Sequence, residues 1–234
     1  MPDQTRPVFG IVAEGKTDQN VIDAILAGIF DDPSFEARRI RPLTTAPLGS
    51  PEGFGSWTNV IPFLESPQFE ETFQEVGILV VHIDTDVCEE LGVSRHEAGA
   101  ITERSLLIDR VEAVLKSKIG AEVWARIGHQ VVFAIPVDSI ECWLLLIHDP
   151  NARKIREQNC LDHLNRTLAK DTRKKRLMIS GDKSPRTYTD LAKAFDNPKE
   201  LQRCAGKSPS LKRFLDNVAQ ALPPAPLAPE TISQ

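Results

Sequence analysis

Aromatic residues are scarce in this chain. Its 234 residues include one tyrosine, three tryptophans and ten phenylalanines, and aromatics make up 6% of the sequence. So few rings argue against an extended stacking platform for single-stranded nucleic acid, which offers aromatic side chains to successive bases. The single tyrosine, Tyr188, lies far along the chain in a basic region. This position disfavours a topoisomerase-type reaction through a tyrosine nucleophile.

Long apolar runs and paired cysteine motifs are missing as well. No run approaches the roughly 18 apolar residues of a membrane span, and the first ten residues show no charged segment followed by an apolar one. The four cysteines, Cys88, Cys142, Cys160 and Cys204, form no CxxC motif. We therefore expect reduced thiols in a cytoplasmic protein that neither spans a membrane nor is secreted.

The net charge is small, but the charges are unevenly distributed along the chain. Overall, 28 Lys and Arg face 33 Asp and Glu, a net charge of −5. Between residues 151 and 213 there are 17 basic and 7 acidic residues, so the acidic excess lies in the rest of the chain. An enzyme that holds a metal ion with carboxylates and a polyanion with Lys and Arg needs this polarity. A basic face that is merely solvated gives the same composition, and both interpretations stay open.

Apolar periodicity divides the first 150 residues into alternating strand and helix segments. Strands are expected at residues 8–13, 35–43, 77–83 and 131–137, and the third, GILVVHI, is almost uniformly apolar. Helices are expected after Thr17, from Trp57 into the region of Phe63 and Leu64 with Pro62 as a limit, from a capping box of Ser94 with Glu97 to Lys118, and after Ser139. The alternation predicts an α/β fold with a mostly parallel, Rossmann-like sheet and helices on both faces.

Strand signals fade after residue 150, and helical segments follow at residues 151–170, 189–195 and 209–222. The sequence thus predicts an α/β metal-binding domain over residues 1–150 and a basic helical extension packed on it over residues 151–222. A Pro-rich flexible tail is predicted over residues 223–234. Residues 46–57, rich in Gly, Pro and Ser, are predicted to form a loop.

Acidic residues follow three of the expected strands. Glu14 follows the first strand, Asp84 and Asp86 follow the third, and Asp138 and Glu141 follow the last. In an open parallel sheet, ligands bind beyond the carboxyl ends of the strands. Carboxylate oxygens suit Mg²⁺ or Mn²⁺ rather than zinc. Each acid taken alone is more often a turn or helix-cap residue, so the metal hypothesis depends on their joint occurrence.

Two of these acidic motifs carry a family resemblance. The string AEGKTD at residues 13–18 and the string IDTD at residues 83–86 together resemble the Toprim domain, found in bacterial primases, topoisomerases and OLD-type nucleases. Residues 137–145, VDSIECWLL, are similar to an E-x-W-L-L stretch of small standalone Toprim-like proteins, many of them linked to phage defence. The resemblance covers about residues 8–149.

The resemblance implies a compact parallel sheet that binds a divalent metal ion. It implies that Glu14 is a general acid or base beside the metal, and that Asp84 and Asp86 are metal ligands. The interval between Glu14 and Asp84 is long for a minimal domain of this family, which indicates an inserted loop near residues 46–57.

Further residues are assigned to the reaction and to substrate binding. Glu141 is the first choice to hold a second cation, and Asp138 is the second choice. Lys183, in the turn GDKSP, is expected to neutralise charge on the transition state, although a solvated loop lysine fits equally well. Nonspecific phosphate contacts are expected from Arg173, Lys174, Lys175, Arg176, Lys207, Lys212 and Arg213.

The leading hypothesis is a Mg²⁺- or Mn²⁺-dependent phosphodiesterase, a nuclease on DNA or RNA with a role in prokaryotic antiviral defence. An alternative is a regulatory subunit that docks on a partner such as an ATPase and has no catalysis of its own. The chain has no GxxxxGK[ST] loop to bind ATP, so ATP binding would belong to the partner. A primase-type nucleotidyl transferase is a third hypothesis. The partners expected are therefore nucleic acid, a partner protein or a second copy of the chain, and no membrane.

Overall fold

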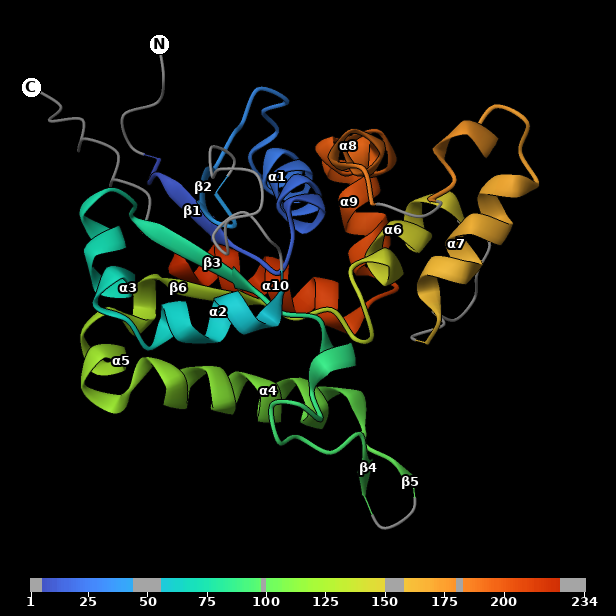
Figure 1. Ribbon diagram of the computed structural model, residues 1–234. Coiled ribbons are helices and arrows are strands. Elements are labelled where there is room, and N and C mark those ends of the chain that lie inside the picture. The colour runs from blue at the N-terminus through green and yellow to red at the C-terminus, as the bar shows by residue number, and fades with distance from the viewer. Residues whose placement is uncertain (1–5, 44–55, 98–99, 150–157, 180–182, 224–234) are drawn as a thin grey trace, which may run out of the picture.

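The computed structural model describes residues 6–43, 56–97, 100–149, 158–179 and 183–223 (Figure 1). Four strands form one parallel sheet, in the order β2-β1-β3-β6. The strands are β1 (Phe9–Val12), β2 (Arg38–Arg41), β3 (Ile78–His82) and β6 (Val131–Ala134). The predicted α/β class with a parallel, Rossmann-like sheet is confirmed. No helix among the described residues is long and apolar enough to cross a membrane.

The adjacent strands β1, β3 and β6 are buried along their whole length. Phe9 pairs with Ile78, and Leu79 pairs with Val131, so the carboxyl ends of these strands reach the same edge of the sheet. The outer strand β2 has the sequence RRIR and is exposed or half-buried. The buried strands are apolar because helices cover both of their faces.

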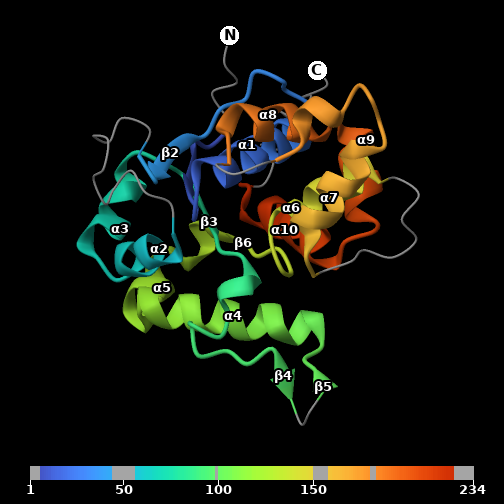
Figure 2. The same cartoon turned by 45° about the vertical axis from the view of Figure 1, so that its right-hand side comes forward.

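One face of the sheet is covered by helices from the first half of the chain (Figures 1 and 2). Val81 and Phe133 point into this layer and pack with the apolar faces of four helices. These helices are α2 (Trp57–Leu64), α3 (Pro67–Glu71), α4 (Arg104–Ile119) and α5 (Ala121–Ile127). In α4, Leu107, Val111 and Leu115 recur at helical spacing and supply the buried stripe.

The opposite face is covered by α1 and by the C-terminal helices, which share one apolar core with Ile11 and Val80 of the sheet. The helices are α1 (Lys16–Phe30), α6 (Glu141–His148), α7 (Cys160–Ala169), α8 (Pro185–Ala192), α9 (Pro198–Ala205) and α10 (Pro209–Ala221). Short 3₁₀ turns connect the elements: η2 (Thr72–Gln74), η3 (Thr85–Val87), η4 (Gly128–Gln130), η5 (Lys175–Leu177) and η6 (Lys193–Asp196).

The region after residue 150 is therefore part of the layer that covers the sheet. Gly28 shows how closely it packs, because a Cβ at this position would lie 1.9 Å from the Phe195 carbonyl oxygen. Only glycine allows the backbones of α1 and η6 to approach so closely. The predicted packing of residues 151–222 onto the α/β part is seen for α8, α9 and α10, which contact α1, α6 or β6.

The predicted helix start at Ser94 with Glu97 is wrong. The short strands β4 (His96–Glu97) and β5 (Ala100–Ile101) pair with each other in antiparallel fashion, and this β4–β5 hairpin lies apart from the main sheet in Figure 2. The Ser94 hydroxyl is bonded within this hairpin, and Glu103 caps α4 instead by accepting from the Leu106 N–H at 3.1 Å. Ile101, expected on the buried helix face, is 68% exposed.

Other predicted boundaries shift or lie outside the described residues. The helix α2 ends at Leu64 as predicted, with Pro62 inside it, whereas α6 has Ile140 rather than Ser139 at its N-cap. The predicted helix at residues 151–170 begins at Cys160 in the described part of the chain. Most of the predicted loop at residues 46–57 and nearly all of the tail at residues 223–234 lie outside the described residues.

Candidate functional site

Glu14 lies in the turn that joins β1 to α1, at the carboxyl end of the sheet. Its Oε1 accepts a hydrogen bond of 2.7 Å from the backbone N–H of Asp84, which follows the neighbouring strand β3. The parallel register of β1 and β3 makes this contact, since the two strands end side by side. The structure therefore brings together the two acidic motifs, although they lie 70 residues apart in sequence.

The chain segments that follow β3 and β6 are hydrogen-bonded to each other beyond the sheet. Thr85 N–H donates to the Pro136 carbonyl oxygen (3.2 Å), and Asp86 N–H donates to the Asp138 carbonyl oxygen (2.9 Å). Asp138 N–H donates in return to Thr85 Oγ1 at 2.7 Å. Asp138 has a φ of 68°, a left-handed conformation that Asp tolerates better than most residues. These bonds fix the acids of both segments relative to one another.

Asp84 is buried, and one of its carboxylate oxygens lacks a hydrogen-bond partner. Its Oδ1 lies 3.1 Å from Nε2 of His82, which is also fully buried. The two atoms do not have hydrogen-bond geometry, and neither finds another partner among the described residues. A buried carboxylate oxygen without a hydrogen bond is costly, and it commonly marks a position where a ligand belongs.

Asp18 is a site residue that the sequence analysis missed. It lies in the first turn of α1, is buried at 5% exposure, and accepts a hydrogen bond from Thr17 Oγ1 at 3.3 Å. A Cβ on Gly15 would lie 3.0 Å from Asp18 Oδ2, so the glycine after Glu14 makes room for this second carboxylate. The sequence signal for Asp18 was its spacing from Glu14. An acid in the first helical turn after a strand-end acid lies at the same carboxyl edge of the sheet.

Lys183 lies where the sequence predicted, beside the acids. Its Nζ is 2.8 Å from Oε1 of Glu141, the first residue of α6, whose side chain is 1% exposed. The Tyr188 hydroxyl donates to the same oxygen. Tyr188 is thus a buried anchor for Glu141, a role that its position in the sequence did not reveal.

The segment that carries Lys183 is held against α1. The Asn20 side chain donates to the Pro185 carbonyl oxygen at 2.7 Å and to Thr189 Oγ1 at 2.9 Å. The two hydrogen bonds from Asn20 and the buried Tyr188 side chain together hold the start of α8 at the acidic edge. Lys183 itself keeps 45% of its side chain exposed, so its ammonium group faces both Glu141 and solvent.

Burial and like charges raise the pKa of most of these acids. The pKa of Glu14 rises to about 8 because burial and the nearby Asp84 both disfavour its ionised form. The pKa of Asp84 lies well above its ordinary range because of burial, then because of Asp18 and Glu141. Burial raises the pKa of Asp18 in the same way, with Glu141 adding to it.

Glu141 behaves in the opposite way. Burial by itself would raise the pKa of Glu141, but the Lys183 charge and the bonds from Lys183 and Tyr188 outweigh it and lower the pKa. The pKa of Lys183 is raised in turn, since the attraction of Glu141, Asp18 and Asp84 exceeds the opposing effect of burial. The Glu141–Lys183 pair is therefore ionised, while the other buried carboxyls have a high proton affinity.

Asp86 and Asp138 form the outer part of the acidic edge. Burial and the neighbouring Asp138 raise the pKa of Asp86, and burial raises that of Asp138. Arg95 is the cation next to them: its guanidinium donates to the Thr85 carbonyl oxygen at 2.6 Å and lies 3.7 Å from Asp138 Oδ1. The sequence analysis did not single out Arg95.

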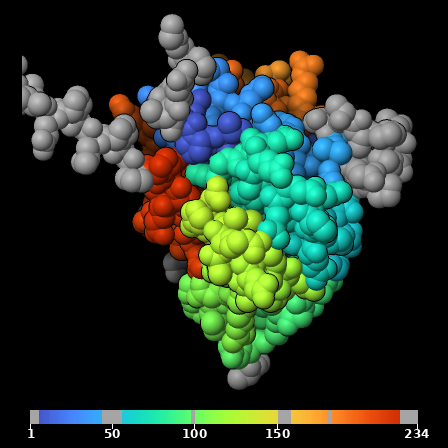
Figure 3. Space-filling view, turned by 90° about the vertical axis from the view of Figure 1, so that its left-hand side faces the viewer, coloured from blue at the N-terminus to red at the C-terminus, as the bar shows by residue number. Residues whose placement is uncertain are grey.

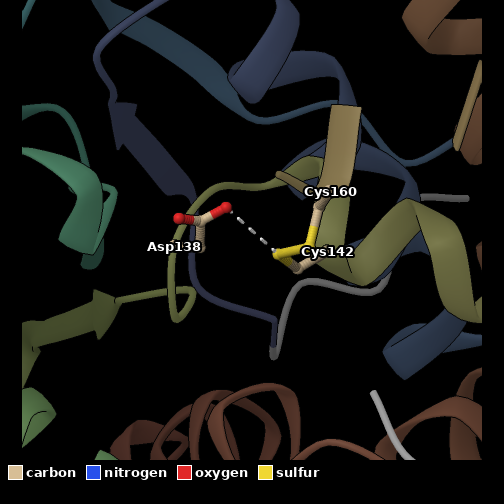
Figure 4. A group of neighbouring side chains, drawn as sticks. All are labelled: Asp138, Cys142 and Cys160. Carbon is tan, nitrogen blue, oxygen red and sulfur yellow. Dashed lines mark hydrogen bonds between the residues drawn. A yellow bond between two sulfur atoms is a disulfide. The ribbon is translucent and has the colours of Figure 1, made fainter. Parts of the chain in front are cut away.

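The one group of three metal-ligand atoms within 4.8 Å of one another in the described part of the chain is Asp138, Cys142 and Cys160. The two cysteines form a disulfide, so their sulfurs are not thiolate ligands (Figure 4). Cys142 Sγ lies 4.0 Å from Asp138 Oδ2. An oxidised sulfur has no proton to donate, so this contact is a weak polar one.

The disulfide corrects the expectation that all four cysteines are reduced thiols. Cys142 follows Glu141 in α6, and Cys160 begins α7, so the bridge is local in space although 18 residues separate the two. Their pairing could not be seen in the sequence, because it depends on how α6 and α7 pack. Cys88 and Cys204 are free and buried, as expected. The argument for a cytoplasmic location from four free thiols is correspondingly weaker.

The predicted phosphate-binding cations do not join the acidic edge as Lys183 does. Arg213 bonds Asp109 and Glu112 of α4, and Lys212 pairs with Asp216 at 2.6 Å. Burial and then the nearby Lys174 charge lower the pKa of His148. Lys174 therefore lies near the last residue of α6, whereas Glu141 is the first residue of that helix. Arg173, Lys175 and Arg176 are exposed, and Lys207 is half-buried.

No family model matches the chain, and comparisons with curated proteins and with solved structures also find no match. The site is an edge of the sheet with two cations, Lys183 and Arg95, and six carboxylates, Glu14, Asp18, Asp84, Asp86, Asp138 and Glu141. An edge with this charge can hold divalent cations and, through them and the two cations, a phosphate group.

Proposed function

We propose that the protein is a divalent-metal-dependent phosphodiesterase, and specifically a nuclease that cleaves DNA or RNA. The observation that carries the proposal is the buried Asp84 carboxylate, which has an oxygen without a hydrogen bond and two like-charged neighbours, Asp18 and Glu141. Buried carboxylates crowded in this way favour either protonation or a bound cation. The donors are hard oxygen atoms, which fit Mg²⁺ or Mn²⁺.

In this proposal the cation is held by Asp84, Asp86 and Asp18, with Glu14 beside them. Glu141 was expected as a further ligand, but its Oε1 is already bonded to Lys183 and Tyr188. We therefore assign Glu141 the role of holding Lys183, and Asp138 that of an outer carboxylate. When bound, the cation would supply Lewis-acid activation of a phosphoryl oxygen and of a water molecule.

The chain's own residues supply proton transfer and charge stabilisation. Glu14 is oriented by the Asp84 N–H at 2.7 Å, and it is the acid–base group that exchanges a proton with the attacking or leaving oxygen. Lys183, fixed by Glu141 but half exposed, stabilises negative charge on the phosphoryl oxygens as the bond order changes. The paired segments after β3 and β6 keep these groups in place without reorganisation.

The test is a cleavage assay with plasmid, linear DNA and RNA in EDTA, Mg²⁺ or Mn²⁺. We expect cleavage that requires a divalent cation, and a loss of roughly 10²-fold or more in Asp84→Asn. Asp216→Asn is the matched control, because Asp216 is an exposed acid paired with Lys212 on α10. Equal cleavage by Asp84→Asn and the parent, after both pass the same purification, would refute this site.

One observation favours a second candidate function. In the described part of the chain, no three carboxylate oxygens of the acidic edge lie within 4.8 Å of one another. A regulatory subunit that uses the fold as a scaffold, and docks on a partner such as an ATPase, does not need a closed cation cage. Calorimetric titration of the parent and of Asp84→Asn separates the two functions. A nuclease loses Mn²⁺ binding in Asp84→Asn, whereas a scaffold protein binds its partner with the same affinity in the parent and in Asp84→Asn.

The setting of the proposed activity rests on the resemblance to Toprim-like proteins alone. On this resemblance we propose a role in prokaryotic antiviral defence.

A further inference from the structure

A cavity of about 390 Å³ lies next to the acidic edge. It is bounded by the β4–β5 hairpin, the first turns of α4 and the chain around the start of α7. Its floor includes Thr85 and Asp138, which belong to the paired segments after β3 and β6. The remaining lining residues have no role in the metal-dependent reaction proposed above.

The walls of the cavity are fixed by bonds that the structure shows. On one side, Arg95 donates to the Thr85 carbonyl oxygen at 2.6 Å, and Thr102 closes the hairpin with its N–H on the Arg95 carbonyl oxygen at 2.8 Å. On the other side, the Cys142–Cys160 disulfide ties the start of α7 to α6. The cavity is therefore built into the fold, as binding sites for small groups usually are.

The lining has the chemistry of a nucleotide site. Four side chains of basic residues, Arg95, His96, Arg104 and His163, face one acid, Asp138. Guanidinium groups bind phosphate oxygens, and guanidinium and imidazole planes stack on unpaired bases. Apolar surface is supplied by Ile101, which is 68% exposed at the rim, and by Leu107. Such a pocket needs no platform of aromatic rings, in agreement with the low aromatic content of the chain.

The cavity shares its inner wall with the proposed reaction site. Asp138 lines it, and the Asp138 carbonyl oxygen accepts the N–H of Asp86 at 2.9 Å. Arg95 spans the boundary, since it lines the cavity and its guanidinium lies 3.7 Å from Asp138 Oδ1. A nucleotide in the cavity would therefore place its neighbouring phosphodiester at the acidic edge.

We propose that this cavity binds one unpaired nucleotide of the substrate, which makes single-stranded or locally unpaired nucleic acid the substrate class. The position beside the scissile bond rests on the proposed function; the nucleotide pocket itself does not. The volume suits one nucleotide, whereas a base pair with both of its backbones is too large for it.

The experiment measures binding without cleavage. Fluorescein-labelled single-stranded dodecamers of DNA and of RNA are titrated with the full-length parent protein in EDTA, and again in Ca²⁺. A duplex of the same length and a dodecamer of abasic units are the comparison probes. We expect the single-stranded probes to bind at least about tenfold more tightly than the duplex and the abasic probe, since a base fills the pocket.

Two exposed positions test the cavity with little risk to folding. Arg104→Glu reverses a charge in the lining, and Ile101→Asp places a charge on the rim. We expect each to weaken single-strand binding by about tenfold or more. Lys118→Glu is the matched control, because it changes the net charge as Arg104→Glu does but lies in the last turn of α4, paired with Glu65.

The outcomes separate the pocket from the nuclease proposal. Equal binding by Arg104→Glu and Lys118→Glu, equal binding of abasic and base-containing probes, or no single-strand binding by the parent in either buffer would each overturn the pocket. A parent that binds single strands and loses this binding in Arg104→Glu, yet cuts nothing in Mg²⁺ or Mn²⁺, supports the pocket and refutes the nuclease. Cleavage that Arg104→Glu does not alter supports the nuclease and counts against the pocket.

Discussion

The acidic edge of the sheet and the basic C-terminal region carry opposite charge, but they hold it in different ways. At the acidic edge, Asp84 and Asp18 are buried close to one another, and burial and repulsion raise the pKa of both. In the basic region, Arg213 is paired with Asp109 and Glu112, and Lys212 is paired with Asp216. At the acidic edge, Lys183 and Arg95 lie beside six carboxylates, so most of the acids are balanced only by protonation or by a bound cation. In the basic region, Arg213 and Lys212 are already paired with acids of the chain itself.

This difference teaches that a run of like charges in a sequence does not by itself indicate a binding site. Exposed ion pairs contribute little to stability and are easily replaced, so basic helices can form for solubility alone. Buried like charges cost free energy, and a fold that keeps them has a use for them. Lys183 illustrates the contrast, because it is the predicted cation that the structure places against a buried acid.

The largest effect should separate two lysines, one from each region. Lys183→Met removes the cation beside Glu141, and we expect the rate of cleavage by the folded protein to fall roughly 10²–10³-fold. Lys212→Met removes an exposed lysine of an i,i+4 pair and should leave the rate close to that of the parent. Single-turnover cleavage rates measure both. Equal losses in the two variants would erase the distinction between the regions.

The second effect concerns the covalent link between the regions. Cys142 follows Glu141 at the acidic edge, and Cys160 begins the helices of the basic region. We expect the variant with both cysteines replaced by serine to lose about 2–4 kcal/mol of unfolding free energy, measured by denaturant titration. Dithiothreitol should lower the stability of the parent by a similar amount and leave the double variant unchanged. A parent indifferent to reductant would contradict the bridge.

A smaller effect is expected in the basic region itself. Replacing the cluster of Arg173, Lys174, Lys175 and Arg176, in which only Lys174 is half-buried, with glutamine should weaken nucleic-acid binding by about tenfold and flatten its salt dependence. Each lost phosphate contact lowers the slope of log affinity against log salt by about 0.7 for a single strand. Glutamine at Lys212 and Arg213 should change that slope less, because these side chains are paired within the protein. Equal slopes for both variants would remove the contrast.

The smallest effect is on stability as a function of pH. In the folded protein the pKa of Glu14 is about 8, above its ordinary value of 4.5, so the folded state binds this proton more tightly than the unfolded state. The stability that the neutral Glu14 carboxyl contributes to the metal-free protein is then fully present below about pH 4.5 and is lost as the pH rises through about 8. We expect the thermal midpoint of the parent in EDTA to fall relative to that of Glu14→Gln over this range. A difference between the two that does not change with pH would show that the Glu14 carboxyl is not destabilised by its surroundings.

The sheet could be predicted because its signals are local. The apolar runs that form β1, β3 and β6 are short, nearly unbroken and separated by helical periodicity, which is enough to predict parallel strands. The segment before α4 could not be placed, because Ser94 and Glu97 satisfy a capping pattern while the hydroxyl of Ser94 is used within a hairpin instead. Local patterns do not show which of two partners a side chain takes.

The site could be predicted in part for the same reason. Glu14 and Asp84 follow strands, so their meeting follows from a parallel sheet. Tyr188 was missed because its place in the site depends on the packing of α8 near α6, which is remote in sequence. Asp18 was missed although its spacing from Glu14 is a local signal. The cavity beside Arg95 depends on the packing of the hairpin against α7, and no pattern in the sequence indicates that contact.

The ion pairs of Arg213 with Asp109 and Glu112 lie at the border of the sheet that β6 forms. The helices α10 and α4 lie on opposite faces, so a bridge between them passes around β6, the last strand in the order, and Figure 3 shows α10 next to α5 on this side. At the other border, β2 presents arginines. An unguarded border strand invites the backbone of another molecule to pair with it, and charge or a covering helix prevents that. The fold thus protects itself from aggregation at both borders while keeping its carboxyl edge open for chemistry.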